Sequence, residues 1–134
     1  MAEDQVLEGG CLCGAVRFVA RGEPENVAIC HCRACQQATG GPFFARALYR
    51  QRQVSVSGET ARFASSAQLW RMGCPACGTP LFGARQDGGS MGLALAAFDD
   101  QHALTPTHHF FVESKAPWVR IDDDLPQYPQ WAPD

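Results

Sequence analysis

Seven cysteines in three short groups are the residues of this sequence best suited to chemistry. They are Cys11-Leu12-Cys13, Cys30-His31-Cys32-Arg33-Ala34-Cys35 and Cys74-Pro75-Ala76-Cys77. Close spacing lets one tight loop direct two thiolates at one ion, and soft thiolate ligands favour zinc among the common divalent metals. An odd number of cysteines leaves one unpaired in a closed disulfide framework, so the groups indicate metal binding rather than disulfides.

A division into four and three ligands supplies one closed and one open zinc site. Structural zinc sites use four protein ligands, whereas catalytic sites use three and keep one position for water or substrate. Glycine follows the first and third groups, at Gly14 and Gly78, and its tolerance of positive φ lets the backbone wrap around the sulfurs. This pattern predicts a closed site from Cys11, Cys13, Cys74 and Cys77 and an open site from Cys30, Cys32 and Cys35.

Spacing alone leaves two alternatives open. Cys32, Cys35, Cys74 and Cys77 also satisfy a two-knuckle zinc pattern, which would leave the other three cysteines together. Cys74 and Cys77 could instead act as a redox dithiol at a helix start, although the following Gly78-Thr79-Pro80 suits a zinc knuckle better.

The elements that position these cysteines are predicted to be short strands between frequent turns. Residues 53–57 alternate polar and apolar side chains, the period of a half-buried strand. Further strands are expected at residues 15–20, 44–49, 68–72, 91–98 and 109–112, and one short helix at residues 33–39. We predict a mainly β single domain over residues 1–134, ending in an extended, proline-rich tail at residues 126–134. Tyr128 and Trp131 in this tail can pack on the domain.

Charge and hydropathy narrow the classes of partner. The formal net charge is −3, the pI is about 5.7 and the Lys and Arg residues are scattered, so no nucleic-acid partner is expected. The first residues are acidic and lack the apolar run of a secretory signal. The longest apolar segment, residues 91–98, is too short to span a bilayer. We therefore expect a cytoplasmic protein with reduced thiols and no membrane partner.

Ordered motifs along nearly the whole chain resemble those of one enzyme family. They are Gly10-Cys11-Leu12-Cys13-Gly14, the group from Cys30 to Cys35 with Gly40-Gly41-Pro42-Phe43, Gly58-Glu59, Phe63-Ala64-Ser65-Ser66, Arg71, Cys74-Pro75-Ala76-Cys77-Gly78-Thr79-Pro80-Leu81, Asp99-Asp100, His109, Lys115-Ala116-Pro117-Trp118 and Leu125-Pro126. In these motifs the chain is similar to the glutathione-dependent formaldehyde-activating enzyme family, which includes centromere protein V. The resemblance implies a mainly β, Mss4-like β-tent of small antiparallel sheets with two zinc sites.

The resemblance also implies the division of ligands. It assigns Cys11, Cys13, Cys74 and Cys77 to a structural zinc, and Cys30, Cys32 and Cys35 to a second, more labile zinc at the active site. The sequence departs from the family at Gln36-Gln37, where a basic residue often follows the third cysteine, and at Gly73, where an aromatic residue is usual.

The expected function follows from the resemblance and the open site. We expect a zinc-dependent carbon–sulfur lyase or synthase that joins a thiol, with glutathione as co-substrate, to formaldehyde or another small aldehyde. The alternative is a non-catalytic zinc module that binds a thiol or a protein partner. His31 is a candidate for proton transfer. Arg46 and Arg71 could meet the carboxylates of glutathione, with exposed strand arginines as the alternative interpretation.

Other conspicuous residues are expected to be structural. His109 is interpreted as a packed strand histidine with a satisfied ring, and a position in the lining of the pocket is the alternative. Phe43 and Trp118 are expected in the core. The run Asp122-Asp123-Asp124 is expected to form a solvated turn.

Overall fold

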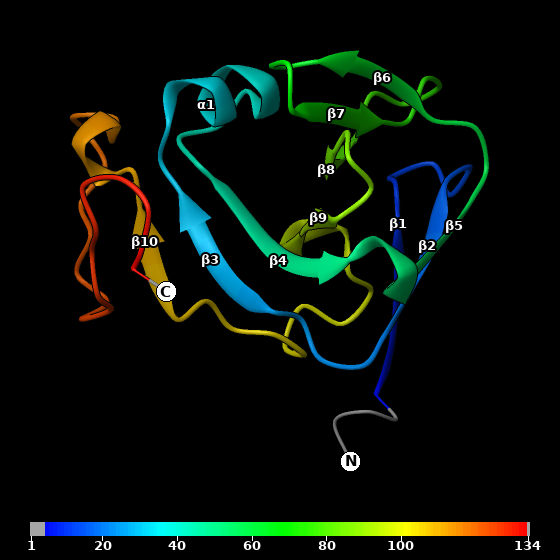
Figure 1. Cartoon of the computed structure of the whole chain (residues 1–134), viewed down its shortest axis with the longest axis horizontal. Coiled ribbons are helices and arrows are strands. Elements are labelled where there is room, and N and C mark those ends of the chain that lie inside the picture. The colour runs from blue at the N-terminus through cyan, green and yellow to red at the C-terminus, as the bar shows by residue number, and fades with distance from the viewer. Residues whose placement is uncertain (1–4, 134) are drawn as a thin grey trace.

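Two sheets account for most of the regular structure in the computed structural model, which describes residues 5–133 (Figure 1). The smaller sheet has three strands in the order β1-β2-β5, and both pairings are antiparallel. Its strands are β1 (Val6–Gly10), β2 (Arg17–Arg21) and β5 (Val54–Ser57). The loop between β1 and β2 carries the first cysteine group.

The larger sheet has seven strands in the order β10-β3-β4-β9-β8-β7-β6. They are β3 (Asn26–Cys30), β4 (Phe44–Arg50), β6 (Ala61–Ala64), β7 (Leu69–Gly73), β8 (Pro80–Arg85), β9 (Ser90–Ala94) and β10 (His108–Phe110). Helix α1 (Arg33–Thr39) joins β3 to β4, and 3-10 turns lie at Gln51–Gln53, Leu95–Ala97 and Val112–Ser114. Of the other two cysteine groups, one begins at the last residue of β3 and the other directly follows β7.

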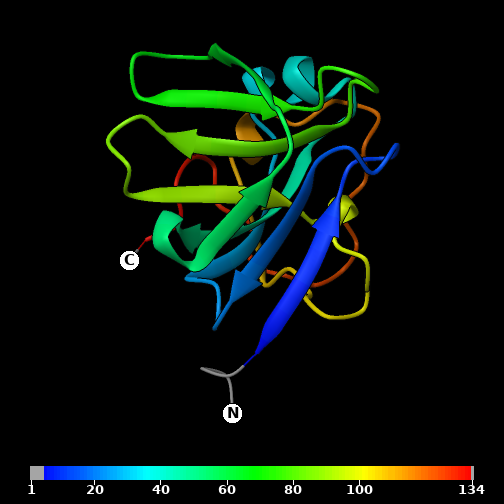
Figure 2. The ribbon, with the colours of Figure 1, turned by 90° about the vertical axis from the view of Figure 1, so that its right-hand side faces the viewer.

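The main core lies where the two sheets approach one another (Figure 2). The ring of Phe18 on β2 meets the rings of Phe82 on β8 and Phe98 edge to face, with centroids 5.6 Å and 5.1 Å apart. Gly9 on β1 is required for this approach, because a Cβ atom there would lie 2.2 Å from the Ala97 carbonyl oxygen. The two sheets are thus packed closely enough to place the β1–β2 and β7–β8 turns together.

The prediction of a mainly β fold with small sheets is confirmed, and so is the helix at residues 33–39. The strand expected at residues 91–98 ends at Ala94, where a 3-10 turn begins. The last strand is shorter than expected and pairs with β3 in parallel, the one parallel pairing between strands of the described residues. Phe111 ends it by taking a positive φ of 57°.

The C-terminal segment packs against β10. The His109 N–H donates to the Pro126 carbonyl at 2.9 Å, and the Tyr128 N–H donates to the His109 carbonyl at 3.0 Å. The Trp131 ring stacks on the Phe110 ring with centroids 5.3 Å apart, so the predicted packing of the tail is confirmed. Trp118 is not a core residue, because 73% of it is exposed, and Phe43 is exposed at the surface as well. Within residues 5–133 no helix has the length and apolarity to cross a membrane.

Candidate metal centres

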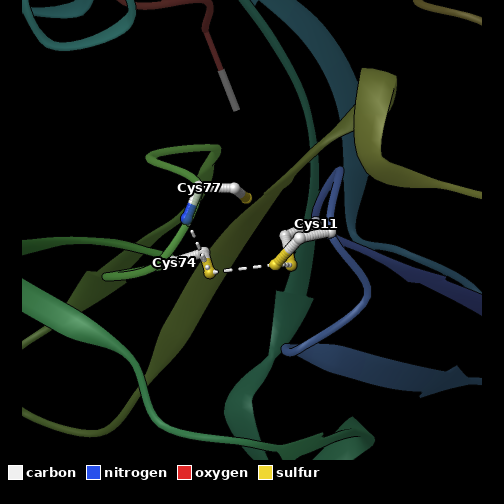
Figure 3. A group of neighbouring side chains, drawn as sticks. Cys11, Cys74 and Cys77 are labelled. Atoms are coloured by element: carbon white, nitrogen blue, oxygen red, sulfur yellow. Dashed lines mark hydrogen bonds between the residues drawn. The ribbon is translucent and has the colours of Figure 1, made fainter.

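The first candidate centre brings together Cys11, Cys13, Cys74 and Cys77 from two turns. The four sulfurs all lie within 4.8 Å of one another. Cys13 Sγ lies 3.6 Å from Cys11 Sγ and 3.8 Å from Cys74 Sγ. Figure 3 shows Cys74 and Cys77 on the β7–β8 turn, facing Cys11 on the β1–β2 loop. The group therefore joins the small sheet to the large one, and four thiols in this arrangement suit a closed tetrahedral site.

Backbone amides surround the sulfurs of this four-cysteine group. The Val16 N–H donates to Cys11 Sγ at 3.3 Å and lowers the pKa of that thiol. Cys77 has its pKa lowered to about 5, first by the Thr79 hydroxyl and then by backbone amides. Gly14 and Gly78 both take positive φ, 83° and 79°, as the sequence predicts. The turns thus favour thiolates on Cys11 and Cys77, the form in which cysteine binds metal, whereas the neighbouring thiols raise the pKa of Cys13.

The second candidate centre gathers Cys30, Cys32 and Cys35 where β3 ends and α1 begins. Their sulfurs also lie within 4.8 Å of one another. Cys32 is the N-cap residue of α1, and its sulfur accepts the Cys35 N–H at 3.3 Å. The neighbouring Cys30 and Cys35 thiols stabilise a thiolate on Cys32 and lower its pKa, while the same interaction raises the pKa of Cys30. Three convergent soft donors suit a divalent metal such as zinc.

Both groups match the division predicted from the glycines. The alternative grouping of Cys32 and Cys35 with Cys74 and Cys77 is not formed among the described residues. All seven cysteines are free thiols, so the chain offers every one of them as a ligand.

Two arginines surround the three-cysteine group, with different contacts. Arg71 on β7 directs both Nη atoms at Cys35 Sγ, each at 3.5 Å, and its Nε donates to the Ser65 hydroxyl. Arg46 on β4 donates to Asn26 Oδ1, and its guanidinium lies 4.9 Å from the centre of the Phe110 ring. Neither is a fully exposed strand arginine. Arg71 directly offsets negative charge on the sulfurs, whereas Arg46 is engaged within the sheet.

His31 is wholly buried behind the cysteine loop. Its Nε2 lies 2.8 Å from His109 Nδ1, and His109 Nε2 lies 2.7 Å from Asp123 Oδ2. Burial, with lesser effects of His109 and Lys115, lowers the pKa of His31 to about 4. His109 is the packed strand histidine that the sequence predicts. The expectation that Asp122-Asp123-Asp124 forms only a solvated turn is wrong for Asp123, because its carboxylate contacts His109. No spacing in the sequence indicates this contact.

Gln36 has a function that sequence reasoning missed. Its side chain is buried, and its Nε2 donates to the His31 and Ser114 carbonyls, both at 2.9 Å. Its Oε1 accepts from Arg33 Nη1 at 2.6 Å. Where the family often has a basic residue, the carboxamide of Gln36 thus joins the cysteine loop to the 3-10 turn at Val112–Ser114.

A cavity of about 250 Å³ is lined by Cys74 of the four-cysteine group and by Arg71, which contacts the three-cysteine group. Helix α1 contributes Thr39 to its wall, and β6 and β7 contribute Arg62, Phe63 and Arg71. We call this cavity the α1–β7 groove. The groove carries two guanidinium groups, and that of Arg71 also contacts Cys35 of the three-cysteine group. Guanidinium groups favour carboxylates, so an anionic ligand suits this groove.

Comparison with known proteins agrees with the cysteine pattern. The model of the glutathione-dependent formaldehyde-activating enzyme family matches residues 6–114. An uncharacterized lyase of Schizosaccharomyces pombe is 35% identical over 81 residues, which cover 60% of this chain and 59% of that protein. A crystal structure of a Rhodobacter sphaeroides protein has a TM-score of 0.53 at 22% identity, over 74% of this chain and 91% of the other. The last likeness concerns the fold alone.

Proposed function

The chain belongs to the glutathione-dependent formaldehyde-activating enzyme family, and from that premise we propose that it is a zinc-dependent carbon–sulfur lyase. In the synthetic direction it joins a thiol, with glutathione as the expected co-substrate, to formaldehyde or another small aldehyde. A carbon–sulfur bond forms, the thiol loses its proton, and the carbonyl oxygen gains one to give an S-hydroxymethyl product. The reverse reaction breaks the same bond.

The donor sets fit the metal that this proposal requires. Cys11, Cys13, Cys74 and Cys77 would hold a structural zinc, because four convergent sulfurs complete its coordination. Cys30, Cys32 and Cys35 would hold the second zinc, since three sulfurs leave room for another ligand. Bound there, zinc would hold an incoming thiol as its thiolate, the nucleophilic form.

The protein's own side chains supply charge and a binding surface for this chemistry. Three thiolates around a divalent ion carry a net negative charge, and the two Arg71 Nη atoms near Cys35 Sγ offset part of it. Arg71 and Arg62 also line the α1–β7 groove, where they favour the carboxylates of a peptide thiol. Holding the thiol and the aldehyde together lowers the entropic part of the barrier. Arg46 is less suited to this task, because Asn26 and Phe110 already engage it.

The open group of three sulfurs is the observation that carries the proposal. The test is NMR exchange spectroscopy on an equilibrium mixture of formaldehyde and glutathione, with zinc-loaded protein, Cys32→Ser protein and buffer compared. We expect faster exchange with the zinc-loaded protein only. Equal rates in all three samples would contradict a glutathione lyase and favour a zinc module that binds a thiol or a protein partner without catalysis.

The charge of the thiol provides a second comparison. Glutathione carries carboxylates and 2-mercaptoethanol carries none, so Arg62→Gln and Arg71→Gln should weaken exchange with glutathione more than with 2-mercaptoethanol. Arg52→Gln is the matched control, because Arg52 lies on an exposed 3-10 turn that does not line the groove.

A further inference from the structure

A chain of three side chains runs from the surface to the loop that carries Cys30 and Cys32. Asp123 Oδ2 lies 2.7 Å from His109 Nε2, and His109 Nδ1 lies 2.8 Å from His31 Nε2. The His109 side chain is 5% exposed and that of Asp123 is 41% exposed, while His31 is wholly buried. Asp123 lies beyond residues 6–114, the range matched by the family model. The proposed lyase chemistry uses none of these three groups.

The hydrogen bonds in this chain have a defined direction when both imidazoles are neutral. A carboxylate can only accept, so His109 Nε2–H donates to Asp123. His109 Nδ1 is then an acceptor and receives the hydrogen of His31 Nε2. Asp123 therefore determines, through His109, which nitrogen of His31 is protonated and how its ring is oriented.

The backbone of His31 is held as firmly as its ring. Its N–H donates to the Phe110 carbonyl at 3.0 Å, and its carbonyl accepts from Gln36 Nε2 at 2.9 Å. His31 itself lies between two of the three sulfur-bearing residues. The residue that joins Cys30 to Cys32 is therefore held both through its backbone and through its ring.

Among the described residues, the His31 ring is not part of the three-cysteine group itself. His31 directly follows Cys30, the last residue of β3. Its ring meets His109 and the ring of Phe43, with a centroid separation of 5.5 Å to the latter. Among the described residues, the candidate metal group contains only the three cysteines. This is the arrangement of an outer support that orients ligands.

We propose that Asp123 is a positioning residue of the three-cysteine site, which acts through His109 and His31 to hold Cys30 and Cys32 in the arrangement that retains a divalent metal ion. The inference rests on the metal site of the proposed function. It makes the C-terminal segment a determinant of metal retention at this site. The four-cysteine site lies on the β1–β2 and β7–β8 turns and shares none of these hydrogen bonds.

The test is zinc release from the zinc-saturated full chain, followed with a coloured chelator. Asp123→Ala is compared with Asp122→Ala, a matched change at an exposed neighbour, and with Asp123→Asn, whose amide oxygen can still accept from His109. We expect Asp123→Ala to lower the affinity of the weaker site about tenfold, the lower end of the range for outer-shell partners of metal ligands. Asp122→Ala should match the wild type, Asp123→Asn should retain most of the affinity, and the tighter site should be unchanged in all variants.

The protonation state of His31 supplies the readout that a merely structural effect would not change. Two-bond proton–nitrogen NMR should show His31 protonated at Nε2 in the wild type and a mixture of tautomers in Asp123→Ala. Equal zinc release from Asp123→Ala and Asp122→Ala, or an equal loss at both sites, would overturn the inference. So would a wild-type His31 protonated at Nδ1.

This experiment separates the inference from the proposed lyase activity, because it uses neither thiol nor aldehyde. If the wild type binds two zinc ions and Asp123→Ala leaves the zinc affinity of the weaker site unchanged, only the positioning role is overturned. A wild type that binds one zinc ion overturns both, since the three-cysteine site would then hold no metal.

Discussion

Replacing Gln36 tests how the three-cysteine loop is held in place. Its Nε2 donates to two carbonyls, of His31 and Ser114, and the residue is only 8% exposed. Gln36→Leu removes both donated hydrogen bonds, one to the buried His31 carbonyl and one to the half-buried Ser114 carbonyl. Each such loss costs about 1–3 kcal/mol, so the free energy of unfolding should fall by about 3 kcal/mol. Leu and Gln have similar helix propensities, so the stability of α1 itself should change little.

The assay is urea unfolding of the zinc-saturated protein, followed by circular dichroism. Gln37→Leu is the matched control, because Gln37 lies on the exposed face of the same helix and should change stability by less than about 0.5 kcal/mol. Gln36→Glu keeps the shape of the side chain but cannot donate, so it should destabilise at least as much as Gln36→Leu. If Gln36→Leu and Gln37→Leu had equal stabilities, the bridging role assigned to this carboxamide would be wrong.

Three further changes address the metal sites, the sheet contact and the buried imidazole. Cys74→Ser should unfold the chain and Cys32→Ser should leave it folded with one zinc, because structural zinc binding is coupled to folding; mass spectrometry and circular dichroism distinguish them. Gly9→Ala should lower stability by about 2–3 kcal/mol in urea melts, since its Cβ would lie 2.2 Å from a carbonyl oxygen. Burial lowers the pKa of His31 to about 4, whereas the imidazole of the unfolded chain has the usual pKa of about 6.5. Between these two values, only the unfolded chain binds a proton at His31. Stability should therefore fall by about 1 kcal/mol between about pH 7 and pH 5.5 in excess zinc, and His31→Gln should abolish this contribution.

Much of the fold's local structure was predictable because it depends on near neighbours in sequence. The alternation around Val54 and Val56 predicts a strand, and β5 lies there. Gly14 and Gly78 were expected at positive φ because a tight cysteine turn requires it, and both adopt it. The strand end at Ala94 was missed, because an apolar run does not reveal where a strand gives way to a 3-10 turn.

The contacts around the candidate sites were predictable only where they are local. Cys32 caps the helix that carries Cys35, a relation of three residues that the sequence displays. The contact of Arg71 with Cys35 joins residues 36 positions apart, and His109 with His31 joins residues 78 apart. The parallel pairing of β10 with β3 creates the second contact, and no periodicity in residues 108–110 signals its partner strand.

By itself the sequence determined the kinds of ligand, their local groups and the short strands that carry them, because spacing within one turn limits where two thiols can point. Tertiary structure decided which groups meet. Cys13 lies near Cys74 because the packing of the two sheets brings their turns together, across 61 residues of sequence. It also decided that Asp123, in an acidic run typical of a solvated turn, contacts a buried histidine. Such pairings depend on the summed packing of both sheets and the C-terminal segment, which no single stretch of residues encodes.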